Sequence, residues 1–466
     1  MLSIDYTGRF GDYRLEKRGT HISGQMFSKN TAILHRSSTN RSDYVSNCNF
    51  FNCDKVDYKK IINPIIEQTA MAAGGKSVII GSDTTEANYE SHAHYLNRND
   101  KDLGPVGNNK DLGFFMHPSI VLDEASEMLL GISDLHIWNR SYDKTNKHER
   151  EYKKRPIEEK ESNRWITCAQ NSKIALKDAA TILFVADREA DIYEAFATLP
   201  DERCDVLIRS KTDRQLYNTD VKLRETLKAQ TAAGHISLII RDGHKRAGRK
   251  ANLSVKHTKV LIARPARFPL SSETPEYVEL YAIEVKEPSD SLAEGEKSIH
   301  WILLTSRKIN SLSDALYAAK CYGLRWQIEL VFGTLKSKGL DIEESQLESG
   351  KALKSMAAMS LIAAVRINQL RTGRENTTVP CSIVFTATQI SLLHVLCKKF
   401  EGQTEKQKNP YPPEALAWGT WVIARLGGWK GYTKNESPPG NKTMLWGWNQ
   451  FLNIFEGWQI ASQIKI

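Results

Sequence analysis

Short apolar runs dominate the middle of the chain, and several of them end in an acidic residue. Aliphatic and β-branched residues over about four to eight positions are typical of buried strands. Four such runs are SVIIGSD (77–83), SIVLD (119–123), MLLGISDLHIW (128–138) and TILFVAD (181–187). Residues 165–179 and 191–199 instead have the apolar spacing of amphipathic helices. Together these segments predict a mixed α/β sheet with helices packed on it.

From Cys204 to about Ser306 the pattern changes almost wholly to strand-like runs separated by turn residues. The runs are DVLIRSK (205–211), HISLIIRD (235–242), KVLIARPARF (259–268), EYVELYAIEV (276–285) and SIHWILLTS (298–306). We therefore expect a large β insertion in this region. Helical spacing returns at 313–337 and again at 351–371.

The two ends of the chain differ from the middle in composition. The first 60 residues are basic and polar with short apolar groups, and the segment after Arg371 is rich in Trp and Gly. A chain of 466 residues is also too long for one ordinary core. We expect an N-terminal helical domain at 1–62, an α/β domain at 63–370 with the β insertion at about 204–306, and a C-terminal helical domain at 371–466.

The positive net charge of the chain favours a negatively charged partner. Lys and Arg number 64 against 55 Asp and Glu, which gives a net charge of +9 and an isoelectric point near 9.0. Such a balance suits a polyanion, because basic side chains release counterions from phosphates. No apolar run approaches the length of a membrane-spanning helix, and the N-terminus lacks the apolar core of a signal peptide. We expect a cytoplasmic protein with no membrane role and with reduced cysteines.

Two acids at strand ends are the first candidates for chemistry. Asp83 closes VIIGSD and Asp187 closes LFVAD, and the carboxyl ends of strands are where sites form in such sheets. An apolar strand that ends in Asp is common in α/β proteins, so either residue alone could be structural. Glu86 and Asp191 lie near these acids, and we expect them to support the site or cap helices rather than bind metal.

A polar stripe on the helix expected at 313–337 supplies the third acid. Tyr322, Arg325, Glu329 and Lys336 fall within an arc of roughly 60° at 3.6 residues per turn. A solvated charged face is the alternative interpretation, but such a face seldom places a single Glu between two cations. Asp83, Asp187 and Glu329 together offer the hard oxygen ligands that Mg²⁺ prefers, and Mn²⁺ could substitute. Arg325 and Lys336 would grip a DNA backbone.

The motifs around these residues resemble those of the IS4 family of DDE transposases, in particular its Tn5-like members. GSDTTEANY resembles the first Asp motif of the family and VADREADIY the second, while the stripe falls at the spacing of the family's Y-R-E-K signature. The resemblance continues through LGPVGNNKDLGFFMHPSIVLD, ESNRWITCA, IRSK, HWILLTS and WVIARLGGW. It therefore covers nearly the whole chain and implies an RNase H-like catalytic fold.

The family resemblance also implies an activity and its partners. It implies cut-and-paste transposition of an insertion sequence in a bacterium, with metal-dependent strand cleavage, hairpin formation, hairpin opening and strand transfer. Double-stranded DNA, both transposon ends and target, would be bound by a synaptic homodimer. Residues 1–62 would form the N-terminal DNA-binding domain, and the C-terminal domain would be the dimerisation region. Trp301 corresponds to the family Trp that stacks on a base flipped from the hairpin, and Arg209 and Lys211 to residues that contact phosphates. The basic loop 244–250 is a further candidate DNA contact.

Two alternatives remain at this point. A structure-specific nuclease on the same RNase H-like fold would cut DNA without joining it, although the β insertion and Trp301 argue against it. A non-catalytic inhibitor that dimerises with a full transposase is the second. It is kept open because Asp83 lies closer to the N-terminus than the first acid of Tn5-like proteins, so the first helix of the end-recognition domain could be short.

Overall fold

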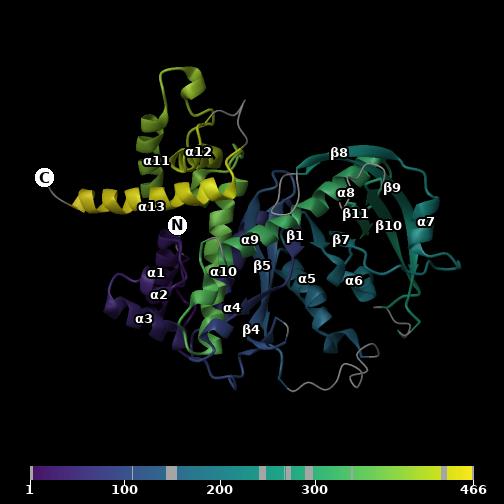
Figure 1. Cartoon of the computed structure of the whole chain (residues 1–466), viewed down its shortest axis with the longest axis horizontal. Coiled ribbons are helices and arrows are strands. Elements are labelled where there is room, and N and C mark those ends of the chain that lie inside the picture. Colours follow the sequence, from purple (N-terminus) through teal and green to yellow (C-terminus); the bar gives the residue numbers. More distant parts are fainter. Residues whose placement is uncertain are drawn as a thin grey trace. The chain divides into compact units, whose positions relative to one another are not determined.

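The computed structural model describes residues 4–107, 109–142, 155–240, 248–266, 268, 274–288, 298–336, 339–431 and 438–463. The chain, drawn in Figure 1 with colours that follow the sequence, divides into two units. The first contains residues 1–72, 84–144 and 328–466, and the second contains residues 73–83 and 145–327. Most of the basic loop expected at 244–250, namely 244–247, lies outside the described residues.

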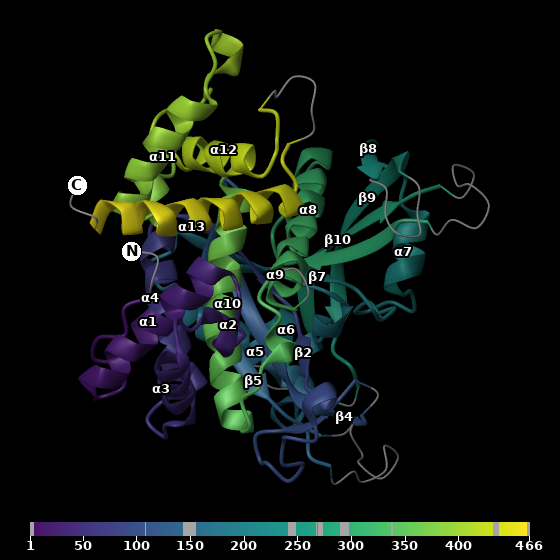
Figure 2. The same ribbon diagram turned by 60° about the vertical axis from the view of Figure 1, so that its left-hand side comes forward.

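A mixed sheet forms the centre of the second unit, with the strand order β1-β6-β7-β11-β10-β9-β8. Figure 2 labels β7, β8, β9 and β10 of this sheet. β1, β6 and β7 are parallel to one another, and the later strands pair antiparallel. The bounds are β1 Ser77–Ser82, β6 Thr181–Ala186, β7 Cys204–Arg209, β8 Gly234–Ile240, β9 Arg249–Ala263, β10 Tyr277–Lys286 and β11 His300–Thr305. The mixed α/β sheet expected from the sequence is therefore confirmed.

The parallel strands are buried and the antiparallel strands are partly exposed. All but the first residue of β1 and of β6 are buried, as expected for strands covered on both faces, whereas β9 alternates between buried and exposed positions over much of its length. Helix α8 packs on β6, β7 and β9. The helices of this unit are α5 Arg164–Ala175, α6 Tyr193–Thr198, α7 Leu223–Ala229 and α8 Leu312–Leu324, and α9 Trp326–Lys336 begins here and continues into the first unit.

The first unit combines helices with antiparallel strands. β4 Asp111–Asp123 pairs with β2 Thr85–Asn88, β3 Gly104–Val106 and β5 Leu129–Trp138. Helix α10, Gly350–Thr372, is buried over most of its length and packs on α1, α3, α13 and β5. The remaining helices are α1 Tyr13–Lys29, α2 Leu34–Ser37, α3 Arg41–Asn52, α4 Tyr58–Ala73, α11 Ala387–Phe400, α12 Leu416–Leu426 and α13 Asn441–Gln463.

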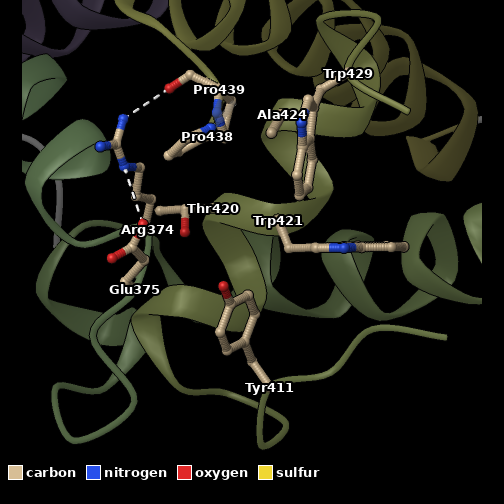
Figure 3. Close-up of a pocket in the computed structure, with 9 residues that line it drawn as sticks. All are labelled: Arg374, Glu375, Tyr411, Thr420, Trp421, Ala424, Trp429, Pro438 and Pro439. Carbon is tan, nitrogen blue, oxygen red and sulfur yellow. Dashed lines mark hydrogen bonds and ion pairs between the residues drawn. The ribbon is translucent and has the colours of Figure 1, made fainter. Parts of the chain in front are cut away.

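The Trp-rich C-terminal segment forms an aromatic core between α11, α12 and α13. Trp448 stacks on Phe451 with ring centroids 5.6 Å apart and meets Phe385 edge to face at 6.0 Å. A small cavity of about 100 Å³ remains beside this core, and the aromatic part of its wall is formed by Tyr411, Trp421 and Trp429 (Figure 3). Most tryptophans of this segment are therefore used for packing.

Most predicted elements are confirmed, but two strands begin earlier than expected. The helices expected at 165–179, 191–199, 313–337 and 351–371 are all present, with small shifts at their ends. β4 and β9, however, begin 8 and 10 residues before the predicted runs at 119 and 259. Their early parts mix polar with apolar residues, so a search for continuous apolar runs missed them.

One element of the expected β insertion is helical instead. Residues 223–229 form α7, which buries Leu223 and Leu227 on one face of the helix. The segment LRETLKA consists mostly of good helix formers, and its two leucines are four residues apart, which is helical spacing. The prediction that this region is almost wholly strand was therefore wrong at α7.

We predict that replacing Asp43 will destabilise the N-terminal helices. Its carboxylate accepts hydrogen bonds from the Thr39 amide, Gln25 and Arg18, at distances of 2.6–2.9 Å. Burial opposes the ionised form, but these donors outweigh it and hold the pKa of Asp43 well below its usual range. Asp43→Ala should lower the free energy of unfolding by about 2–3 kcal/mol, measured by urea denaturation.

The pH dependence of stability should change with the same substitution. Because the folded pKa of Asp43 is depressed, its contribution is present above the unfolded value of about 3.9 and is lost as pH falls below it. Glu67→Ala, which removes an exposed carboxylate paired with Arg9, is the control and should cost less than about 1 kcal/mol. Equal losses in the two variants would contradict the prediction.

Candidate active site

The pairing of β1 with β6 places two of the predicted acids next to each other. Gly81 lies opposite Val185 in this parallel pair. Asp83 and Asp187 each follow these partners by two residues, so they leave the sheet at the same level and the same edge. Both side chains are half-buried. The second unit therefore presents two neighbouring carboxylates at the carboxyl ends of adjacent strands.

Asp83 also has a cationic partner from the polar stripe. Nη1 of Arg325 donates to Oδ2 of Asp83 at 2.8 Å, and the two side chains are 14% and 23% exposed. Arg325 has helical backbone angles between α8 and α9, so the two helices run on with little interruption. The helix thereby brings a guanidinium onto an acid that is 242 residues away in sequence.

Tyr322 and Trp301 form an aromatic pair one turn before Arg325. Their rings meet edge to face with centroids 5.4 Å apart. Tyr322 is buried, whereas Trp301 is half-buried and helps to line a cavity of about 470 Å³ between α8 and strands β8 to β11. The cavity wall is mostly apolar, and Leu253, Val285 and Leu316 contribute to it. Trp301 thus borders an apolar space larger than a single side chain.

The surroundings of Asp187 are built from hydrogen bonds and ion pairs. Asp187 caps a short 3-10 helix by accepting from the amide of Glu189 at 2.8 Å. Asp191 is fully buried, pairs with Arg214, and accepts from the amides of Lys211 and Thr212. Asp191 is therefore committed to holding the loop after β7, as expected for a supporting residue.

Glu329 and Lys336 belong to the first unit, whereas Asp83 and Asp187 belong to the second. Neither unit by itself contains all three acids. Glu329 lies in the first turn of α9 and is half-buried. Lys336 lies in the last turn and pairs with Glu343 at 3.0 Å. Arg325, Glu329 and Lys336 are spaced along one continuous stretch of helical chain, as the sequence spacing predicted.

The two basic residues after β7 differ in their environment. Arg209 donates from Nη2 to the backbone oxygen of His300 at 2.9 Å, which ties the end of β7 to the start of β11. Lys211 is exposed, while its backbone amide is held by Asp191. The side chain of Lys211 is therefore more accessible to a partner in solution than that of Arg209, which is bound to the backbone of His300.

Several residues near the site were missed in the sequence. Arg164 pairs with Glu189 at 2.6 Å, and Thr84, next to Asp83, lies 2.9 Å from Nδ1 of the buried His117. Trp326 is 57% exposed immediately after Arg325. Only the position of Trp326 beside the stripe could have been noticed, because the other contacts join segments far apart in sequence.

The two aspartates at the strand ends are of a type that can bind a metal ion. Asp83 and Asp187 offer carboxylate oxygens, the ligand type of Mg²⁺ and Mn²⁺. Within the described ranges, no three or more His, Cys, Asp or Glu side chains gather into a group that could hold a metal. The chemistry of the two aspartates suits a divalent cation, and Arg325 now occupies one of their oxygens.

Two comparisons with known proteins found similar chains. Residues 155–366 match a family model described as the transposase DDE domain, a range that includes Asp187, Trp301 and Glu329 and begins after Asp83. A cryo-EM structure of the piggyBac transposase synaptic complex with hairpin DNA is similar with 10% identity and a TM-score of 0.35. That similarity covers 87% of this chain and 59% of the piggyBac chain. The family match, which spans less than half of the chain, supports a transposase.

Proposed function

We propose that this chain is a DNA transposase of the IS4 type that moves an insertion sequence by cut-and-paste transposition. The observation that carries the proposal is the pair Asp83 and Asp187 at the ends of adjacent parallel strands, with Arg325 beside them. The family match over 155–366 supports the same activity. An RNase H-like organisation of the α/β region and Tn5-like chemistry are part of the proposal.

Asp83, Asp187 and Glu329 are proposed as the catalytic carboxylates that hold Mg²⁺, or Mn²⁺ in its place. A divalent metal bound there supplies Lewis acidity to the attacking and leaving oxygens at phosphorus. Glu329 is assigned through the spacing of the stripe, since it lies one helical turn after Arg325. The protein's own contribution is to orient these carboxylates and to align the DNA strand for in-line attack.

Basic side chains around the acids are proposed to grip the DNA backbone. Arg325 offers a planar fork that fits a phosphate, and Lys336 extends the same helical stripe. Arg209 and Lys211 provide a second contact at the end of β7. Such contacts fix the position of the duplex without reading its sequence.

Trp301 and Tyr322 are proposed to stabilise the hairpin step. A hairpin end is tight enough to force a base out of the stack, and an aromatic ring is the usual support for such a base. The cavity of about 470 Å³ beside Trp301 has room for a nucleobase and a mostly apolar wall. The exposed ring of Trp326 offers a further stacking surface near the acids.

The outer parts of the chain are proposed to bind transposon ends and to form a synaptic homodimer. The N-terminal helices α1 to α4 carry many basic residues, which suits binding of double-stranded DNA. In the C-terminal helices, Trp446, Ile454 and Ile460 of α13 are exposed by 37–57%, and exposed apolar side chains favour a protein interface. In the part of the chain that the structure describes, no helix is long and apolar enough to cross a bilayer.

The test of the proposed function is Mg²⁺-dependent cleavage of DNA that carries the ends of the chain's own element. Asp83→Asn, Asp187→Asn and Glu329→Gln should each slow strand cleavage by more than about 100-fold, because loss of a metal ligand should exceed loss of a group that only orients one. Products would be separated on denaturing gels. Asp220→Asn is the control. It removes an exposed acid from the unit that contains Asp83 and Asp187, and it should leave the cleavage rate unchanged.

Two outcomes of the cleavage assay would favour another function over that of a transposase. DNA binding without cleavage by the intact chain would favour the non-catalytic inhibitor. Cleavage without hairpin or joined products would favour a structure-specific nuclease.

We predict that Trp301→Ala slows hairpin formation and leaves the rate of the first nick unchanged. Stacking of a base on an aromatic ring contributes about 1–3 kcal/mol, so hairpin formation should slow by roughly 5- to 150-fold. Trp301→Tyr keeps a ring and should retain most of the rate. The two steps can be timed in one reaction with an end-labelled substrate. An equal slowing of nicking and hairpin formation would show that Trp301 has only a structural role.

A further inference from the structure

The carboxylate of Asp83 is held by a group that opposes the role proposed for it. Arg325 donates to Oδ2 of Asp83 at 2.8 Å, and both side chains are only partly exposed. Partial burial lowers the effective dielectric, which makes this pair stronger than an exposed ion pair. Asp83 is therefore close to neutralised by a residue of its own unit.

A guanidinium and a divalent cation compete for the same carboxylate. Arg325 stays protonated at any ordinary pH, so its charge cannot be removed by titration. Its positive charge repels a second cation, and its hydrogen bond occupies a ligand oxygen. In this position Arg325 lowers the affinity of Asp83 for a metal.

Arg325 has a second partner available if the chain binds DNA. The guanidinium fork matches a phosphate as well as it matches a carboxylate. The neighbouring Trp326 is 57% exposed, so the helix reaches solvent next to Arg325. A backbone phosphate arriving at this face can take over the guanidinium while the carboxylate remains in place.

Resting on the proposed function, we propose that Arg325 keeps Asp83 poor in metal until a DNA phosphate takes over its guanidinium. Metal and DNA then raise each other's affinity by the same factor, because linkage between two bound ligands is reciprocal. The arrangement would load the site with metal mainly when DNA is in place. Arg325 is in this sense a positioning residue that couples the two ligands.

The test measures Mn²⁺ binding to the full-length chain, from the electron paramagnetic resonance signal of free Mn²⁺. Each protein is titrated alone and with a short blunt duplex of arbitrary sequence, since the proposed contact is to the DNA backbone. Arg325→Gln keeps a hydrogen-bond donor but removes the charge. Without DNA it should bind Mn²⁺ at least about fivefold more tightly than the intact chain. Adding the duplex should tighten binding to the intact chain by a similar factor and to the variant much less.

Two matched variants control for charge and for folding. Arg325→Lys keeps the positive charge, so its affinity without DNA should stay close to that of the intact chain. Arg224→Gln removes an exposed arginine of the same unit that donates to the backbone oxygen of Lys211, and it should change neither titration. Thermal unfolding of each variant, recorded without added metal, checks that it has folded.

The outcomes separate this coupling from the proposed function itself. If Arg325→Gln binds Mn²⁺ no more tightly than the intact chain, while Asp83→Asn abolishes binding, the metal site stands and the coupling is overturned. If the gain in Arg325→Gln persists when Asp83→Asn is added, the metal binds elsewhere. That result, or no Mn²⁺ binding by any of the proteins, overturns both the coupling and the metal site of the proposed function.

Discussion

The parallel pairing of β1 with β6 is the constraint on which the proposed chemistry depends. Parallel neighbours end at the same edge of a sheet, and here their register puts Asp83 and Asp187 at the same level. Both strands are buried over all but their first residue, so packing on both faces of the sheet holds the pair in place. Two carboxylates are thereby held close together at the partly exposed edge of a rigid sheet.

Two like charges at one edge require compensation, and the helical chain of α8 and α9 supplies it. Arg325 pairs with Asp83, while Tyr322, one turn earlier, packs on Trp301. The same helix therefore joins the acidic edge of the sheet to the aromatic wall of the large cavity. Because Tyr322 and Arg325 are only three residues apart on this helical chain, a change at one of these contacts is expected to affect the other.

Polar groups that do no chemistry hold the segments around the site. Asp191 is buried with Arg214 and fixes the loop after β7, and Glu189 pairs with Arg164 at the start of α5. In the N-terminal helices Asp43 has a similar role between α1 and α3. The carboxylates of Asp191 and Asp43 are buried and therefore costly to leave unpaired, so their contacts favour one arrangement of the segments that they join.

The sequence by itself was sufficient to predict the mixed sheet, most of its helices, and the acids and basic residues proposed to act. Apolar runs and helical periodicity depend on near neighbours, so SVIIGSD, TILFVAD and the stripe from Tyr322 to Lys336 could be recognised locally. The early parts of β4 and β9 could not be recognised in this way, because they mix polar with apolar residues and their partners in the sheet decide which positions are buried. Only the tertiary structure showed Arg325 on Asp83, Tyr322 on Trp301 and Arg164 on Glu189. These pairs join residues 21 to 242 positions apart, and no local pattern encodes which distant charge or ring will meet another.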